Sequence, residues 1–189
     1  PKQISGDMPW TYGLNEGIQT VDGFSGATPL ANAAAHAIEK IPDNWTLFVG
    51  LIPGSIGETS KIAILLGAII LLFTGVGNWR IMLTTILGGL FMGFILNLFA
   101  LNPFMQISPL TQILMGGFLF GAVFMATDPV TASQTNTGKY IYGFLIGILA
   151  ILIRVLNPAY PEGMMLAILF MNALAPLIDH YVVEANIKR

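Results

Sequence analysis

Residues 79–100 read WRIMLTTILGGLFMGFILNLFA, an apolar run whose one charged residue, Arg80, stands at its beginning. A helix needs about 20 consecutive apolar residues to cross the hydrocarbon core of a bilayer. Because this run has that length and carries no charge in its interior, it predicts a membrane-spanning helix. It therefore sets the class of fold that we expect for the chain.

Further apolar runs stand on both sides of this one, at about 61–76, 111–127, 139–156 and 163–183. The breaks between them are rich in Gly, Pro and Asn, which are common turn residues. The run at 61–76 is close to the lower length limit of about 17 residues for a crossing. We therefore expect an all-α integral membrane protein, with a helical bundle of about five transmembrane spans over residues 60–189.

The composition supports this class and excludes several kinds of site. Hydrophobic residues make up 54% of the chain and charged residues only 10%, whereas soluble domains carry about a quarter charged residues. The net charge of −2 gives no reason to expect a nucleic-acid partner. Without cysteine the chain can hold neither a disulfide nor an iron–sulfur cluster. Redox chemistry here would therefore need an organic cofactor.

Residues 1–59 are polar and rich in Gly, Pro, Asp and Asn, and they contain the stretch DGFSGATPL at 22–30. Pro29 suits the first position of a helix, and Thr28 suits the N-cap before it. We expect a short helix over 29–40. The first N–H groups of a helix favour negative charge, so a phosphate on the Thr28 oxygen would be stabilised.

The stretch DGFSGAT also resembles the flavinylation motif of membrane respiratory complexes, which is Asp, two residues, Ser/Thr, Gly, Ala and Ser/Thr. The resemblance continues in order through FMATDPV, YPEG, APLIDH and NIKR, which occupy 124–130, 160–163, 175–180 and 186–189. Together these segments are similar to the C-terminal half of the B subunit in the family of Na⁺-translocating NADH:quinone reductases. The D subunit of the related Rnf complex shares the flavin motif and ATDPV, whereas the ending HYVVEANIKR favours the B subunit.

The resemblance implies FMN in phosphoester linkage to Thr28, with Asp22, Ser25 and Gly26 in the motif that a flavin transferase recognises. It also implies a second, non-covalent flavin (riboflavin), quinone and Na⁺ as partners, and a fold similar to the urea and ammonium channels. We expect the NADH site on another subunit, because no G-x-G-x-x-G pattern follows a strand here. The chain starts without Met, and we expect it to be a fragment of a longer subunit.

Three function classes follow. The first is a redox subunit that carries FMN and passes electrons towards quinone while Na⁺ is translocated. The second is the Rnf D subunit, and the third is a channel or transporter. The flavin motif separates a redox subunit from a plain channel, which has no use for it.

Lysine and arginine predict the orientation in the membrane. An odd number of spans places residues 1–59 and the C-terminus on opposite sides. With a cytoplasmic C-terminus, Lys139, Lys188, Arg80 and Arg189 lie inside, whereas Lys61 and Arg154 lie near the outer face. We therefore expect a bacterial inner-membrane protein with a periplasmic flavin loop.

Two spans carry the same glycine pattern, GGLFMG at 88–93 and GGFLFG at 116–121. Small residues four apart lie on one helical face and allow helices to approach closely. The alternative is that these faces leave room for a flat ring, such as a flavin or a quinone headgroup.

Two carboxylates lie at or within span ends and are candidates for a Na⁺ path. Asp179 stands three residues after Pro176, whose missing N–H frees the carbonyl of Asn172, so an amide, a carbonyl and a carboxylate share one helical face. Asp128 stands among hydroxyl-bearing residues, and Na⁺ prefers oxygen ligands. The competing interpretations are an interfacial, solvated Asp179 and an Asp128 that caps a helix beginning at Pro129.

Overall fold

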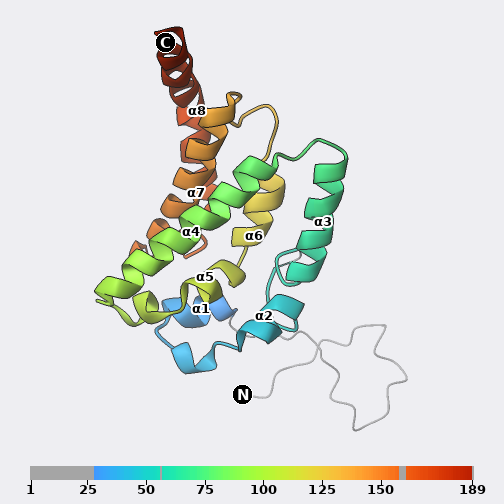
Figure 1. The fold of residues 1–189 in the computed structure, drawn as a ribbon. Helices are drawn as coiled ribbons and strands as arrows, with labels where there is room; N and C mark the ends of the chain where they lie inside the picture. Colours follow the sequence, from blue (N-terminus) through green and yellow to red (C-terminus); the bar gives the residue numbers. More distant parts are fainter. Residues whose placement is uncertain (1–27, 56, 158–160, 189) are drawn as a thin grey trace.

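The structure is a computed structural model that describes residues 28–55, 57–157 and 161–188. The described residues form helices and no strand, which confirms the all-α class (Figure 1). Three helices are long and apolar enough to cross a membrane: α4 (Trp79–Phe99), α7 (Asn136–Leu156) and α8 (Met164–Ile187). A fourth apolar helix, α3 (Lys61–Phe73), is shorter.

Five segments run alternately between the two ends of the molecule: α3, α4, the broken segment 109–125, α7 and α8 (Figure 1). Two short helices, α1 (Pro29–Ala34) and α2 (Asn44–Val49), lie at one end, which we call the Thr28 end. The C-terminus and the loop 126–135 lie at the other, which we call the Asp179 end. The structure thus has the alternating path that five spans require, although only three of the segments have full spanning length.

The third segment is broken, so the expectation of one continuous helix over 111–127 is wrong. It consists of α5 (Pro109–Leu114), α6 (Phe118–Phe120) and a π-helix (Gly121–Met125). Between α5 and α6 the chain turns at Gly116, whose φ is 61°. Glycine adopts this left-handed conformation without a side-chain penalty. The pattern GGFLFG therefore begins at a helix break.

The helix expected over 29–40 is also shorter than predicted. It ends at Ala34, and a separate 3₁₀ turn covers Ile38–Lys40. His36 has φ 59°, and its N–H donates to Ala33 O while Ala37 N–H donates to Asn32 O. These two bonds form a Schellman motif, which closes the helix with His36 where glycine is usual.

The glycines of α4 serve helix packing. A Cβ on Gly88 would stand 2.2 Å from the backbone O of Phe144 in α7, and one on Gly89 would stand 2.5 Å from the Phe118 ring. The space beside them is already filled by protein, which confirms the packing interpretation for GGLFMG.

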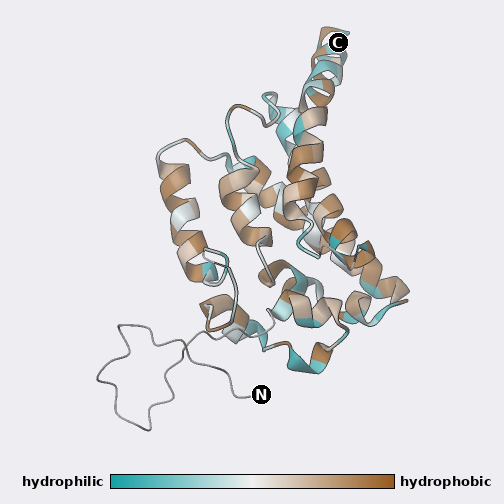
Figure 2. Ribbon diagram, turned by 180° about the vertical axis from the view of Figure 1, so that it is seen from behind, coloured by the Kyte–Doolittle hydropathy of each residue, from teal (hydrophilic) through white to brown (hydrophobic). Residues whose placement is uncertain are grey.

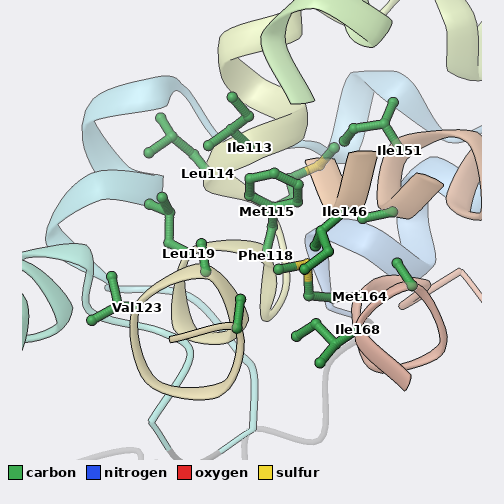
Figure 3. Close-up of a cluster of buried hydrophobic side chains, with 14 of the residues drawn as sticks. Ile113, Leu114, Met115, Phe118, Leu119, Val123, Ile146, Ile151, Met164 and Ile168 are labelled. Atoms are coloured by element: carbon green, nitrogen blue, oxygen red, sulfur yellow. The ribbon is translucent and has the colours of Figure 1, made fainter. Parts of the chain in front are cut away.

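One part of the buried core lies where α5, α6, α7 and α8 meet, and Figure 3 shows Phe118, Ile146 and Met164 converging there. Helices α3 and α4 also contribute buried side chains to the core, such as Ile64 and Ile81. Many large apolar side chains on the long helices are nevertheless exposed, among them Phe94 and Leu169. Figure 2 shows hydrophobic residues along these helices and hydrophilic residues towards the C-terminal end of α8. Apolar side chains on the outside are typical of a protein whose solvent is lipid.

Candidate functional site

Thr28 is the N-cap of α1, as the sequence predicts. Its Oγ1 accepts a hydrogen bond from the N–H of Ala31 at 3.1 Å, and Pro29 occupies the first turn. The side chain is half-buried. Asp22, Ser25 and Gly26 lie outside the described residues, so their roles in flavin attachment stay predictions.

Helix α1 is seated on the break in the third segment. Leu30 is 4% exposed and Ala33 is fully buried. A Cβ on Gly116 would stand 2.9 Å from Leu30 Cδ2, so the two residues are in close contact. The position of Thr28 is therefore tied to the conformation of the break.

Two charged side chains hold the break. The Nη1 of Arg154 donates to the carbonyl of Gln112 in α5 at 2.5 Å, and its Nε donates to the carbonyl of Pro161 at 3.2 Å. On the other side of the break, the N–H of Gly117 donates to Glu162 Oε1 at 2.8 Å. A cation thus lies at the C-terminal end of one half-helix and an anion at the N-terminal end of the next. Both charges oppose the partial charge of the helix dipole at their end.

A second pair of charges completes what we call the break cluster, Glu58, Lys61, Arg154 and Glu162. Lys61 is fully buried at the start of α3 and donates to the backbone O of Glu58. The Glu58 carboxylate accepts the N–H of Ser55 at 2.9 Å. The cluster holds two acids and two bases, which balance in charge.

Lys61 and Arg154 lie at the Thr28 end, as the charge distribution along the sequence predicts. They are buried, however, with Arg154 only 1% exposed, and their grouping with two acids was not predicted. Charged residues at the ends of apolar runs were the available signal, because such residues usually face a protein partner.

At the opposite end, four donors of one loop surround the carboxylate of Asp179. Oδ1 accepts from Ser133 Oγ at 2.6 Å and from both Oγ1 and N–H of Thr135, at 2.6 and 3.0 Å. Oδ2 accepts the N–H of Gln134 at 2.7 Å. Thr135 is also the N-cap of α7, so Asp179 joins α8 to the beginning of α7. It is not merely a solvated interfacial residue.

All four donors to Asp179 are uncharged. Among the residues that the structure describes, the ion pair that forms joins Lys188 to Glu184 near the end of α8 and does not include Asp179. The Asp179 carboxylate thus keeps its full negative charge while oxygen atoms of two hydroxyl groups lie beside it.

Asp128 lies in the same loop and bonds locally. Its Oδ2 accepts the hydroxyl of Thr131 at 2.6 Å and the N–H of Thr131 at 3.0 Å. The Thr131 hydroxyl holds the pKa of this carboxyl below its usual range. Asp128 therefore caps a turn, and the expectation of a helix beginning at Pro129 is wrong, because α7 begins only at Asn136.

A polar pocket of about 150 Å³ lies beside this loop. Its lining includes Asp128, Thr127, Ser133 and Lys139 together with the α3–α4 turn. Ser133 lines the pocket and also donates to Asp179. The structure thus brings both candidate carboxylates to one loop: Asp128 lies in it beside the polar pocket, and Asp179 bonds to it from α8.

Asn172 has a different partner. Its Oδ1 accepts a hydrogen bond from the hydroxyl of Tyr142 in α7. Asn172 and Asp179 both lie on α8, which contains Pro176 in its interior. The Asn172 side chain thus contacts the second turn of α7, whereas Asp179 contacts the loop before this helix.

Comparisons with known proteins identify the family of this chain. A family model described as the NQR2, RnfD, RnfE family matches residues 1–188. The B subunit of the Na(+)-translocating NADH-quinone reductase of Ectopseudomonas mendocina is 52% identical over 195 residues, which cover 100% of this chain and 46% of that protein. The subunits of the same name from Chromohalobacter salexigens and Pseudomonas aeruginosa are each 50% identical, with 45% and 46% of their lengths covered.

The chain thus spans about half the length of the curated relatives that it matches. Its similarity covers every segment described above, from the Thr28 end to the loop around Asp179. With its apolar helices, this chain is a multi-pass membrane protein that belongs to the NQR2, RnfD, RnfE family.

Proposed function

We propose that this chain is the membrane redox part of a Na⁺-pumping NADH:quinone reductase. In this proposal it carries FMN on Thr28 and passes electrons towards quinone while Na⁺ crosses the membrane. It works with other subunits, one of which holds the NADH site, and with riboflavin as a second flavin. The names of its relatives support membership in such a complex.

The observation that carries the Na⁺ part is the Asp179 carboxylate, which is held by four uncharged donors. A charge inside a membrane is costly unless something compensates it. Na⁺ is a hard cation that prefers carboxylate, hydroxyl and carbonyl oxygens. Asp179, with the hydroxyls of Ser133 and Thr135, offers that chemistry, and Asp128 and Asn172 are the next candidates on the path.

The residues at the Thr28 end fit a covalently attached FMN. Thr28 Oγ1 faces the N–H of Ala31, so a phosphate on this oxygen would have N–H donors within reach. The residue lies outside the spanning helices, where a transferase can reach it. When bound, FMN supplies electron transfer in one- or two-electron steps. The chain itself holds the attachment point against the helix break through Leu30.

Mass spectrometry of the peptide that contains Thr28 tests the flavin. Protein co-expressed with its flavin transferase should show the added mass of FMN less water on this peptide. Thr28→Ala should abolish the modification, whereas Thr46→Ala in α2 should retain it. An unmodified wild-type peptide would refute the attachment. The fold should survive Thr28→Ala, because losing an N-cap costs only about 1 kcal/mol.

The Na⁺ dependence of quinone reduction tests the role of Asp179. Asp179→Asn should raise the Na⁺ concentration that gives half-maximal activity and leave the flavin on Thr28 in place. The control is Glu184→Gln, on the same helix but paired with Lys188. If Asp179→Asn leaves Na⁺ dependence and pumping unchanged, the Na⁺ path does not include Asp179.

The Rnf D subunit remains the second candidate, because the matching family model includes it by name. The subunits that purify with the chain separate the two. An NADH-oxidising quinone reductase supports the first proposal, whereas ferredoxin-dependent electron transfer supports the second.

A further inference from the structure

A lysine without a bonded partner lies beside the polar pocket at the Asp179 end. Lys139 lines this pocket of about 150 Å³ together with Asp128, Ser133 and the turn between α3 and α4. Its side chain is half-buried. Within the described part of the chain, its amine forms neither a hydrogen bond nor an ion pair, whereas its backbone N–H donates to Thr135 O at 2.9 Å.

The position of Lys139 on its helix does not account for its charge. Lys139 is the fourth residue of α7, which begins at Asn136 after the N-cap Thr135. The N-terminus of a helix carries a partial positive charge, so the helix dipole disfavours a cation in the first turn. Any group that favours an ammonium ion here must therefore belong to another segment.

Two carboxylates from outside α7 lie close to Lys139. Asp128 lines the same pocket. Asp179 lies against the residue that precedes the lysine, because a Cβ on Gly138 would stand 2.6 Å from Asp179 Oδ1. The same Cβ would stand 2.2 and 2.4 Å from the two hydroxyl oxygens that bond to Asp179. Lys139 thus follows directly on a point where three oxygen atoms converge, and it forms an ion pair with neither acid.

An ammonium group and Na⁺ favour the same surroundings, because each carries one positive charge and contacts oxygen atoms. A lysine on its flexible stem beside the oxygen ligands of a cation therefore attracts the carboxylates when Na⁺ is absent, and it repels Na⁺ that enters. Its effect is to weaken binding of the ion. Transport requires such a limit, since an ion that crosses a membrane has to leave its site as well as enter it.

We propose that Lys139 sets the affinity of the Asp179 end for Na⁺ by competing with the ion for Asp128 and Asp179. This role rests on the proposed Na⁺ path and deepens it. Lys139 is not a ligand of the ion, and its charge acts through the two carboxylates. Arg80 carries the same charge at the same end, but it does not line the pocket, and its guanidinium donates to the side chain of Asn136.

Removal of the lysine charge should strengthen Na⁺ binding, which is the opposite of the effect expected for Asp179→Asn. In the assembled complex, the thermal unfolding midpoint of this chain is measured against NaCl, with KCl added to keep the ionic strength constant. In Lys139→Met, the Na⁺ concentration that gives half of the stabilisation should fall about threefold, within the range that a half-exposed pair of charges reaches. Lys139→Gln should show the same fall, whereas Lys139→Arg should keep the wild-type value because it retains the charge.

Arg80→Met is the matched control, because it removes one positive charge from the same end without changing a residue that lines the pocket. It should leave the half-saturating Na⁺ concentration unchanged. An equal fall in Arg80→Met and Lys139→Met would show an effect of the general surface potential and overturn the role of Lys139. An unchanged value in Lys139→Met would do the same, as expected of a lysine that merely extends to lipid headgroups. If Na⁺ does not stabilise the wild type, the proposed Na⁺ path itself is refuted, and the role of Lys139 with it.

Discussion

The two ends of this protein hold their charged side chains in different ways. At the Thr28 end, the break cluster gathers two bases and two acids, and each of them bonds to the backbone around a broken helix. At the Asp179 end, a lone carboxylate is bonded to four uncharged donors. The charges at the Thr28 end thus balance one another, whereas the Asp179 end keeps a negative charge.

This difference suggests a structural role for the charges at the Thr28 end and a transport role for the carboxylate at the Asp179 end. Charges that oppose the dipoles of two half-helices stabilise a break and have little left to offer a mobile ion. A carboxylate held only by hydroxyl and N–H groups can accept a cation without displacing a salt bridge. We therefore expect changes at the Thr28 end to affect folding and the flavin, and changes at the Asp179 end to affect Na⁺.

The largest expected effect is on labelling from the two sides of the membrane. A cysteine in place of Ser25 should react fully with an impermeant thiol reagent applied to the periplasmic side, and one in place of Lys188 only after the membrane is opened. The native chain has no cysteine that would react. Labelling of both from one side would mean that the chain crosses the membrane an even number of times, and the short α3 would be the first segment to question.

Arg154→Met should have the next largest effect, on stability. The variant leaves the carbonyls of Gln112 and Pro161 without the donor that Arg154 supplies, and each buried polar group that loses its partner costs about 1–3 kcal/mol. The free energy of unfolding in detergent measures it. Arg80 is a half-buried arginine at the other end, and Arg80→Met should cost less. Arg80 makes one side-chain hydrogen bond, to the amide oxygen of Asn136, and lies near the rings of Trp79 and Tyr140. Equal losses of unfolding free energy in the two variants would contradict a structural role for the break cluster.

Binding of Na⁺ at the Asp179 end should stabilise the fold. At a Na⁺ concentration about 100 times the Kd, linkage adds about 2.7 kcal/mol, so the thermal unfolding midpoint should be higher in NaCl than in KCl of equal ionic strength. Asp179→Asn should remove this difference, and Glu184→Gln should keep it. A difference that persists in Asp179→Asn would place the ion elsewhere.

The smallest expected effect is on the acid titration of Asp128. The Thr131 hydroxyl lowers the pKa of this carboxyl, so its stabilising contribution is present above the ordinary value of about 3.9 and is lost as pH falls through the lowered pKa. Thr131→Val should raise the pKa towards the ordinary value, as carbon NMR of the carboxyl can measure. Asp43, whose pKa is lowered by the Thr46 hydroxyl, should not change. An unaltered pKa of Asp128 would contradict the Thr131 hydroxyl as the cause.

Local features of the fold could be predicted from the sequence because they depend on neighbouring residues. The ends of α4 match the predicted span within one residue, since apolar length and the turn before it decide them. Thr28 as N-cap followed likewise from Thr-Pro. The end of α1 could not be predicted, because His36 takes a conformation that histidine seldom adopts.

The sequence by itself determined that this chain is a helical membrane protein with alternating segments, that it has a threonine at a helix start, and that carboxylates stand at its span ends. Only the tertiary structure decided that the third segment breaks, because Arg154 and Glu162 come from α7 and the turn after it to satisfy the freed backbone groups. It also decided that Asp179 bonds to residues 133–135, which precede it by more than 40 positions. Hydrogen bonds between distant segments leave no periodic pattern in a sequence, so the chemistry of each end became visible only once the helices were packed.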